Sequence, residues 1–163
     1  MNDKIELLEE DELILNHENQ YFLFYAHADL YGIDASFVKE IVEHQSFTKV
    51  PNLNRSILGV TNIRGDIVSV IDFLDRCNIC KTILTKKSSF VILNHNGQKI
   101  ALLIDEIYEV DGFDDARLLD APKFGTKIKA QYISKLVEYR GQNVSILNLD
   151  ALLNLEELSK EVR

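Results

Sequence analysis

The segment at residues 58–73, LGVTNIRGDIVSVIDF, constrains the fold of this chain more than any other. Two apolar stretches flank the polar run NIRGD, and this pattern predicts two strands joined by a tight turn. Gly65 supplies the positive φ angle that such a turn requires, which leaves Arg64 at its tip. Apolar residues fill both alternating sets of positions in the second strand, Ile67 and Ile71 among them, so we expect it to be buried on both faces.

The same turn sequence occurs a second time. Residues 139–149 align with residues 63–73 without a gap, and both contain Arg-Gly followed by Val-Ser. Upstream, two predicted hairpins at 21–34 and 89–105 occupy corresponding places, and the second contains Asn-Gly, a strong hairpin signal. The chain therefore reads as two related all-β halves of about five short strands, with few short helices. Small barrels of this size close their sheet edges, and such halves can exchange terminal strands.

Charge and hydropathy narrow the class of partner. The net charge is -8, and residues 1–20 hold seven acids against one lysine, so the rest of the chain is close to neutral. An acidic tail on a near-neutral body argues against nucleic acid or anionic lipid as partner. No basic, apolar leader and no stretch of about 20 apolar residues is present, so we expect a cytoplasmic protein without membrane insertion.

Catalytic patterns are missing from the sequence. It has no glycine-rich phosphate loop, no nucleophile elbow and no histidine pair with metal-binding spacing. The adjacent acids at 9–12 and 114–115 fit solvated surfaces better than a buried general acid, whose pKa must be shifted by a pocket. We therefore expect a binding protein that is not an enzyme and holds no cofactor.

Two cysteines form a single C-x-x-C motif at Cys77 and Cys80. This spacing suits a redox couple or half of a zinc site, but the βαβ context of a thioredoxin motif is absent and the four histidines are scattered. We expect two reduced thiols after the second strand and no metal. A thiol or metal-binding protein acting through these two residues stays open as an alternative.

The run at 58–73 resembles the signature of the CheW family, the coupling proteins of bacterial chemotaxis. Ser69, where the family usually has proline, is the departure. The positions that match as they stand are Gly59, Val60, Asn62, Arg64, Gly65, Ile67, Val70 and Asp72.

The resemblance implies a fold of two packed SH3-like five-stranded β-barrels. It extends over about residues 21–155, which we expect to form two halves at roughly 21–85 and 86–155. An acidic N-terminal tail at 1–20 and a C-terminal tail at 156–163 would flank this domain.

A second match assigns a candidate binding site. The run FVKEI at 37–41 is similar to the family's Val-x-Glu-Ile, which contributes with the signature to a groove for the receptor's hairpin tip. Carried over, the candidate receptor-binding residues are Val38, Glu40, Gly59, Arg64 and Gly65. The residues alone also allow structural roles. Val38 is equally an ordinary core residue, and Gly65 serves the backbone geometry of the turn. Glu40 forms a surface ion pair with Arg64 or Lys39. No surface is assigned to the kinase.

The function implied by the resemblance is an adaptor that couples methyl-accepting chemoreceptors to the histidine kinase CheA. Its expected partners are a receptor's cytoplasmic tip and the CheA regulatory domain. We expect the protein to be a monomer on its own and to bind them at receptor arrays beneath the inner membrane. A coupling protein of a parallel pathway for twitching or development is an alternative. A third possibility is a fragment of CheA or CheV, against which the start at Met1 and the end at Arg163 argue.

Overall fold

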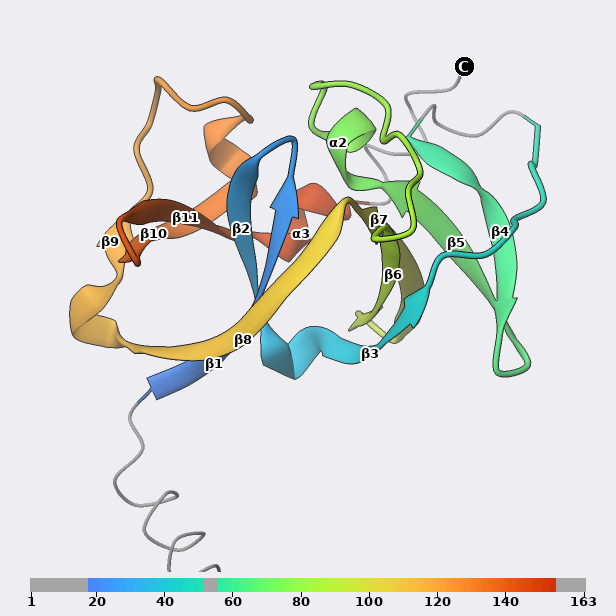
Figure 1. The fold of residues 1–163 in the computed structure, drawn as a ribbon, viewed down its shortest axis with the longest axis horizontal. Helices are drawn as coiled ribbons and strands as arrows, with labels where there is room; N and C mark the ends of the chain where they lie inside the picture. Colours follow the sequence, from blue (N-terminus) through green and yellow to red (C-terminus); the bar gives the residue numbers. More distant parts are fainter. Residues whose placement is uncertain (1–17, 52–55, 155–163) are drawn as a thin grey trace, which may run out of the picture.

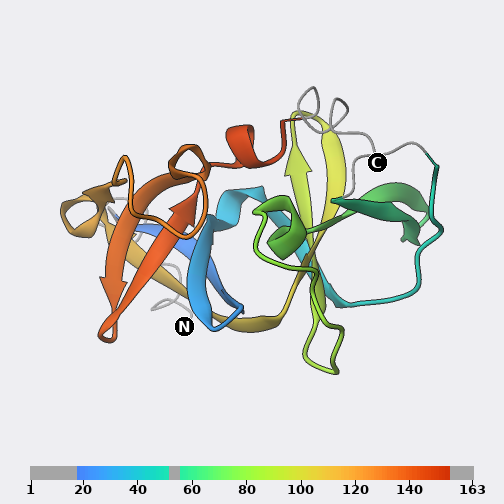
Figure 2. The ribbon, with the colours of Figure 1, turned by 90° about the horizontal axis from the view of Figure 1, so that it is seen from above.

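The computed structural model describes residues 18–51 and 56–154, which form two β-barrels lying side by side (Figures 1 and 2). The predicted acidic tail lies largely outside the described residues, and its last part, from Glu18, belongs to the first strand. The predicted C-terminal tail at 156–163 also lies outside them.

One barrel contains a six-stranded sheet in the order β8-β1-β2-β11-β10-β9. Its strands are β1 (Glu18–Ala26), β2 (Asp29–Asp34), β8 (Glu106–Asp114), β9 (Leu119–Asp120), β10 (Ile133–Tyr139) and β11 (Gln142–Leu147). Short helical turns precede or follow them at η1 (Ala35–Phe37), η2 (Asp115–Arg117), η3 (Ala130–Tyr132) and α3 (Leu149–Leu152).

The other barrel contains a five-stranded sheet in the order β3-β6-β7-β5-β4. Its strands are β3 (Val38–Glu43), β4 (Ile57–Ile63), β5 (Asp66–Asp72), β6 (Ser89–His95) and β7 (Gln98–Ile104), and α2 (Phe73–Arg76) follows β5. An isolated bridge between Thr48 and Val60 takes the place that the two-residue β9 has in the first barrel. The predicted all-β fold of two SH3-like barrels with few short helices is confirmed.

The two halves, predicted at roughly 21–85 and 86–155, exchange their third strands. β3 leaves the first half of the chain and pairs antiparallel with β6, whereas β8 leaves the second half and pairs antiparallel with β1. The opening hairpin of each half leaves one edge of its first strand, β1 or β6, unpaired within that half. The third strand of the other half, β8 or β3, pairs with this edge. Alternating hydrophobicity identifies a strand but not its partner, so the sequence left this exchange open.

The duplicated sequence produces duplicated structure. The hairpins β4–β5 and β10–β11 each end in a short helix, and each helix is capped by the residue that precedes it. Asp72 accepts hydrogen bonds from the backbone N–H groups of Leu74 and Asp75, and Asn148 accepts one from that of Ala151. β5 and β11 also each pair in parallel with the second strand of an opening hairpin.

A shared core joins the barrels. Phe24 and Tyr31 from one sheet pack with Phe73 of α2, the helix that follows β5 of the other sheet, with ring centroids 5.2 and 4.9 Å from the Phe73 centroid. Buried Arg76 of α2 reaches across to the end of α3, where its Nε donates to the carbonyl oxygen of Leu152 at 2.7 Å. Because aromatic packing and this buried bond both cross between the barrels, we treat them as one folding unit.

One local expectation, the burial of Ile67 in β5, needs correction. Ile67 is 68% exposed, whereas Ile71 is buried as expected. The parallel pairing of β5 with β7 begins only at Ser69, so the first residues of β5 extend beyond the sheet with a neighbour on one side only.

Candidate partner-binding site

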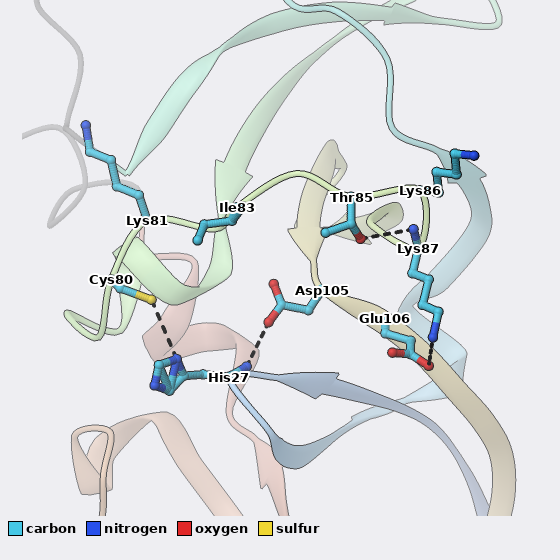
Figure 3. Close-up of a pocket in the computed structure, with 9 residues that line it drawn as sticks. All are labelled: His27, Cys80, Lys81, Ile83, Thr85, Lys86, Lys87, Asp105 and Glu106. Atoms are coloured by element: carbon cyan, nitrogen blue, oxygen red, sulfur yellow. Dashed lines mark hydrogen bonds and ion pairs between the residues drawn. The ribbon is translucent and has the colours of Figure 1, made fainter.

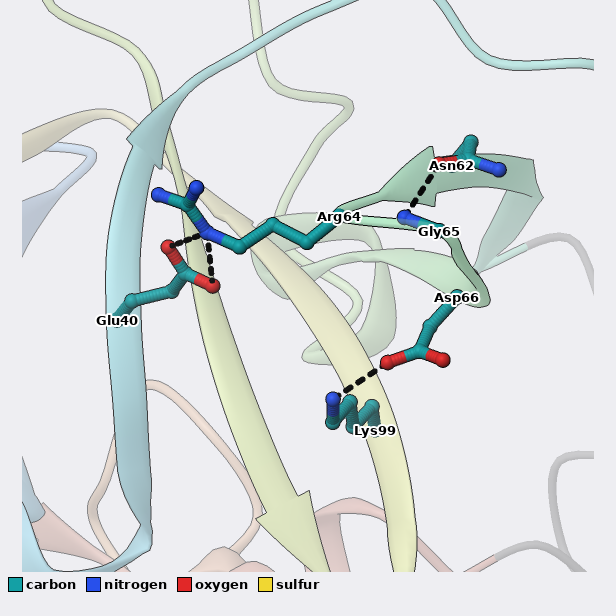
Figure 4. A network of polar contacts seen from close by, with 6 residues as sticks. All are labelled: Glu40, Asn62, Arg64, Gly65, Asp66 and Lys99. Atoms are coloured by element: carbon teal, nitrogen blue, oxygen red, sulfur yellow. Dashed lines mark hydrogen bonds and ion pairs between the residues drawn. The ribbon is translucent and has the colours of Figure 1, made fainter.

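The candidate site is centred on the turn between β4 and β5 (Figure 4). Arg64 and Gly65 occupy its two central positions with φ angles of 51° and 90°, the signs that a two-residue hairpin turn of this hand requires. The side chain of Asn62 accepts a hydrogen bond from the backbone N–H of Gly65 at 2.9 Å. The backbone role predicted for Gly65 is thus observed, and Arg64 lies at the tip of the turn.

Arg64 reaches from this turn to β3. Its Nε donates to both carboxylate oxygens of Glu40, at 2.9 and 3.1 Å. Of the two ion pairs that the sequence allowed for Glu40, the structure forms the one with Arg64. The Arg64 side chain is 75% exposed and that of Glu40 only 24%, so the carboxylate is partly sheltered and the arginine is open to a partner. Among the described residues, nothing else accepts from the guanidinium, whose Nη groups point outward (Figure 4).

A second ion pair borders the turn. Lys99 of β7 donates to the Asp66 carboxylate at 2.5 Å. No pattern in the sequence pointed to Lys99, since it lies far along the chain from Asp66 and follows no motif. Because each acid beside the turn has its own cation, a partner that approaches Arg64 meets no unpaired carboxylate from Glu40 or Asp66.

Gly59 allows a close backbone contact beside the site. A Cβ atom at this position would lie 2.2 Å from the carbonyl oxygen of Thr48, so no side chain fits without moving the backbone. Thr48 exchanges two backbone hydrogen bonds with Val60, at 2.7 and 2.8 Å. Gly59 itself is buried, and its role in the structure is to let the segment after β3 close against β4.

Apolar residues neighbour the charged pair along the chain. Val38 is half-buried and packs against the shared core, so the structural role that the sequence left open for it is observed. Ile41, next to Glu40, is 37% exposed, and Ile67, just after the turn, is 68% exposed. The sequence led us to expect Ile67 in the core, yet both isoleucines add exposed apolar surface to the strands β3 and β5 that adjoin the site residues.

The second copy of the turn differs in its surroundings. Arg140 has the same positive φ angle as Arg64, at 52°, and pairs with Glu109 of β8 at 3.2 Å. It also donates to the hydroxyl of Tyr108 at 3.3 Å and lies over the ring of Tyr139 at 5.0 Å. Tyr139 donates a short hydrogen bond to the same glutamate. Arg140 is therefore held by three neighbours, whereas Arg64 has one.

Comparisons with known proteins identify the family of the chain. The family model of the CheW-like domain matches residues 20–157, which include every candidate site residue. The chain belongs to the CheW family. A chemotaxis protein CheW of Treponema pallidum is 30% identical over 145 residues, covering 86% of this chain and 85% of that protein. The CheW of Bacillus subtilis is 26% identical over 140 residues, covering 86% and 90%.

A solved CheW structure shares the architecture. The scaffolding protein TtCheW from Thermoanaerobacter tengcongensis superposes with a TM-score of 0.77 at 30% identity, covering 83% of this chain and 87% of that one. In the described part of this CheW-family protein, no helix is long and apolar enough to cross a membrane.

The thiol alternative finds no support in this CheW-family fold. Cys77 is buried at the end of α2, and burial raises the pKa of its thiol to about 12, so the reactive thiolate is disfavoured. Cys80 is exposed and also has a raised pKa, chiefly from lost solvation and then from Asp105. Within residues 18–51 and 56–154, no cluster of three or more His, Cys, Asp or Glu side chains has the arrangement of a metal site.

Proposed function

We propose that this protein couples the cytoplasmic tip of a methyl-accepting chemoreceptor to the regulatory domain of the histidine kinase CheA. The chain is a chemotaxis coupling adaptor of the CheW family. It acts by holding its partners together, in the cytoplasm at receptor arrays, and carries out no reaction of its own. The finding that supports a protein-binding role is a charged turn whose arginine is anchored on one side and open on the other.

The receptor contact is assigned to Val38, Glu40, Gly59, Arg64 and Gly65. Glu40 fixes the Nε side of the Arg64 guanidinium and leaves the Nη groups to donate to a carboxylate or carbonyl oxygen of the receptor. Gly65 sets the turn, Gly59 sets the path of the closing segment, and Val38 anchors β3 to the core.

The balance of charged and apolar surface suits an exchangeable contact. An open arginine gives orientation and specificity, and the exposed Ile41 and Ile67 give modest apolar area. Transient signalling contacts of this kind bury less surface than obligate dimers. We therefore expect binding that is reversible and weakened by added salt, because part of it rests on an exposed charge.

The test uses the purified full chain, a receptor cytoplasmic-tip fragment and the CheA regulatory domain. Calorimetry measures binding to each partner alone, and size-exclusion chromatography asks whether all three elute together. The proposal predicts binding to both partners and a ternary complex that needs this chain. Failure to bind either partner would refute the coupling role.

A further inference from the structure

A cavity of about 850 Å³ opens between three segments of the two barrels (Figure 3). His27 lies in the turn between β1 and β2, Asp105 lies where β7 passes into β8, and Cys80 and Ile83 lie on the segment between α2 and β6. The cavity shares no lining residue with the candidate receptor site, so the function proposed above does not use it.

The charges at this cavity do not balance. The Asp105 carboxylate accepts from the backbone N–H of His27 at 2.8 Å, and Lys87 pairs with Glu106 at 3.8 Å. Lys81 and Lys86 also line the cavity, and neither has an ion pair or side-chain hydrogen bond within the described part of the chain. Three lysines line the cavity against two acids, because the Asp105 carboxylate keeps its charge when it accepts from a neutral N–H, so the rim has a surplus of positive charge and neither Lys81 nor Lys86 has a carboxylate partner among the described residues.

The cavity also has an apolar wall without a cover. Ile83 lines it and is 82% exposed, an unusual position for a large aliphatic side chain. Cys80 lies inside with its Sγ 3.8 Å from His27 Nδ1. An occupant that suits this surface carries both carboxylates, for Lys81 and Lys86, and aliphatic side chains, for Ile83.

We propose that the acidic N-terminal segment of the same chain, residues 1–17, docks in this cavity. The segment contains six acids against the single cation Lys4, and its acids alternate with aliphatic residues. Its early part is the best example, because Leu7 and Leu8 stand between Glu6 and Glu9. The charge is therefore complementary to the rim, and the aliphatic side chains match the uncovered wall.

The length of the segment permits this contact. β1 has nine residues, from Glu18 to Ala26, and ends beside His27 at the cavity. At about 3.3 Å per residue in a strand, the segment must return roughly 30 Å from Glu18 to the cavity. Seventeen residues can span up to about 56 Å when extended, so the first nine or so residues can reach it. Because the contact is within one chain, weak pairing is enough to fill the site.

Cys80 provides a direct readout, because a docked segment covers its thiol. We would use the full chain with Cys77→Ala, so that Cys80 is the only thiol, and the same variant starting at Glu18. Iodoacetamide is uncharged and reports access without responding to the lysines. The rate of Cys80 modification should be several-fold lower in the full chain than in the shortened chain, and the difference should shrink as salt is added. A synthetic peptide of residues 1–17 should restore protection to the shortened chain.

A charge variant and its matched control test the site itself. Lys81→Glu with Lys86→Glu should remove the difference between full and shortened chains, whereas Lys49→Glu with Lys123→Glu, at two exposed lysines outside the cavity, should keep it. Comparing the two lengths within each background cancels any change in the thiol's pKa that the substitutions themselves cause. Equal rates in the full and shortened chains would overturn the proposal. Protection that persists after both Lys81 and Lys86 are changed to Glu would also overturn it, as would protection by a scrambled peptide. Protection that increases with protein concentration would overturn it too, because it would indicate that a second copy of the chain covers the thiol.

Discussion

The replacement Arg64→Ala tests the candidate site most directly when it is compared with Arg140→Ala in the duplicated turn. Both residues have the same backbone conformation, so the pair controls for the effect of the turn itself. The contacts differ, since Arg64 holds only Glu40, whereas Arg140 holds Glu109, Tyr108 and the ring of Tyr139. The two variants should therefore fail in different assays.

The expected size of each effect follows from exposure. The Arg64 side chain is 75% exposed, so its pair with Glu40 contributes roughly 0–1 kcal/mol to folding and the variant should unfold near the wild-type urea midpoint. Losing a charge-assisted hydrogen bond to a receptor costs about 1–3 kcal/mol, which is roughly a 5- to 150-fold rise in Kd. Arg140→Ala should lower the urea midpoint more and leave the receptor Kd nearly unchanged.

Calorimetry against one receptor-tip fragment gives the Kd values, and urea unfolding followed by circular dichroism gives the stabilities. Glu40→Gln serves as an intermediate case, because it removes the charge that anchors the arginine and keeps the side-chain shape. The reasoning is refuted if both arginine variants weaken binding equally, or if Arg64→Ala binds normally while folded.

Three further outcomes are expected. Gly59→Ala should destabilise the fold by about 1–3 kcal/mol in urea unfolding, since its Cβ meets the Thr48 carbonyl, and a wild-type midpoint would contradict this. Burial raises the pKa of the Cys77 thiol to about 12, above its ordinary value near 9. Because the unfolded chain then loses this proton at lower pH than the folded chain, stability should be intact below pH 9 and fall as the pH rises toward 12. In Cys77→Ala this alkaline loss of stability should be smaller. A fragment ending at residue 85 contains every candidate receptor residue, yet it should neither show a folded β spectrum nor bind the receptor until the rest of the chain is added.

Local features of the fold could be predicted from the sequence because they rest on short-range physics. The Arg64-Gly65 turn, its repeat at Arg140-Gly141 and the strands around both follow from turn chemistry and alternating apolar residues. The sequence offered two cations, Arg64 and Lys39, as partners for Glu40, because a glutamate pairs with a positively charged side chain nearby. The structure forms the pair with Arg64. These elements have the same bounds in the structure to within a few residues.

The features that escaped prediction depend on long-range pairing. Nothing in the sequence of β3 says that its partner is β6 and not a strand of its own half. The exposure of Ile67 depends on where β7 begins to pair, and the contact of Lys99 with Asp66 depends on the same strand. Each of these follows from the register between strands that are distant in sequence, which an alternating pattern alone does not set.

The strand exchange has a consequence for the candidate site. All its predicted residues lie between Val38 and Gly65, in the first half of the chain, but the strands that carry them are held by the second half. β3, with Glu40, pairs only with β6, and β5, which completes the Arg64 turn, pairs in parallel with β7. The distance from Arg64 to Glu40 is thus fixed by strands β6 and β7 lying between them in the sheet. On the proposed assignment, binding at this site should report the assembly of both halves, and we expect a mutation in β6 or β7 that loosens the sheet to weaken binding without touching the partner.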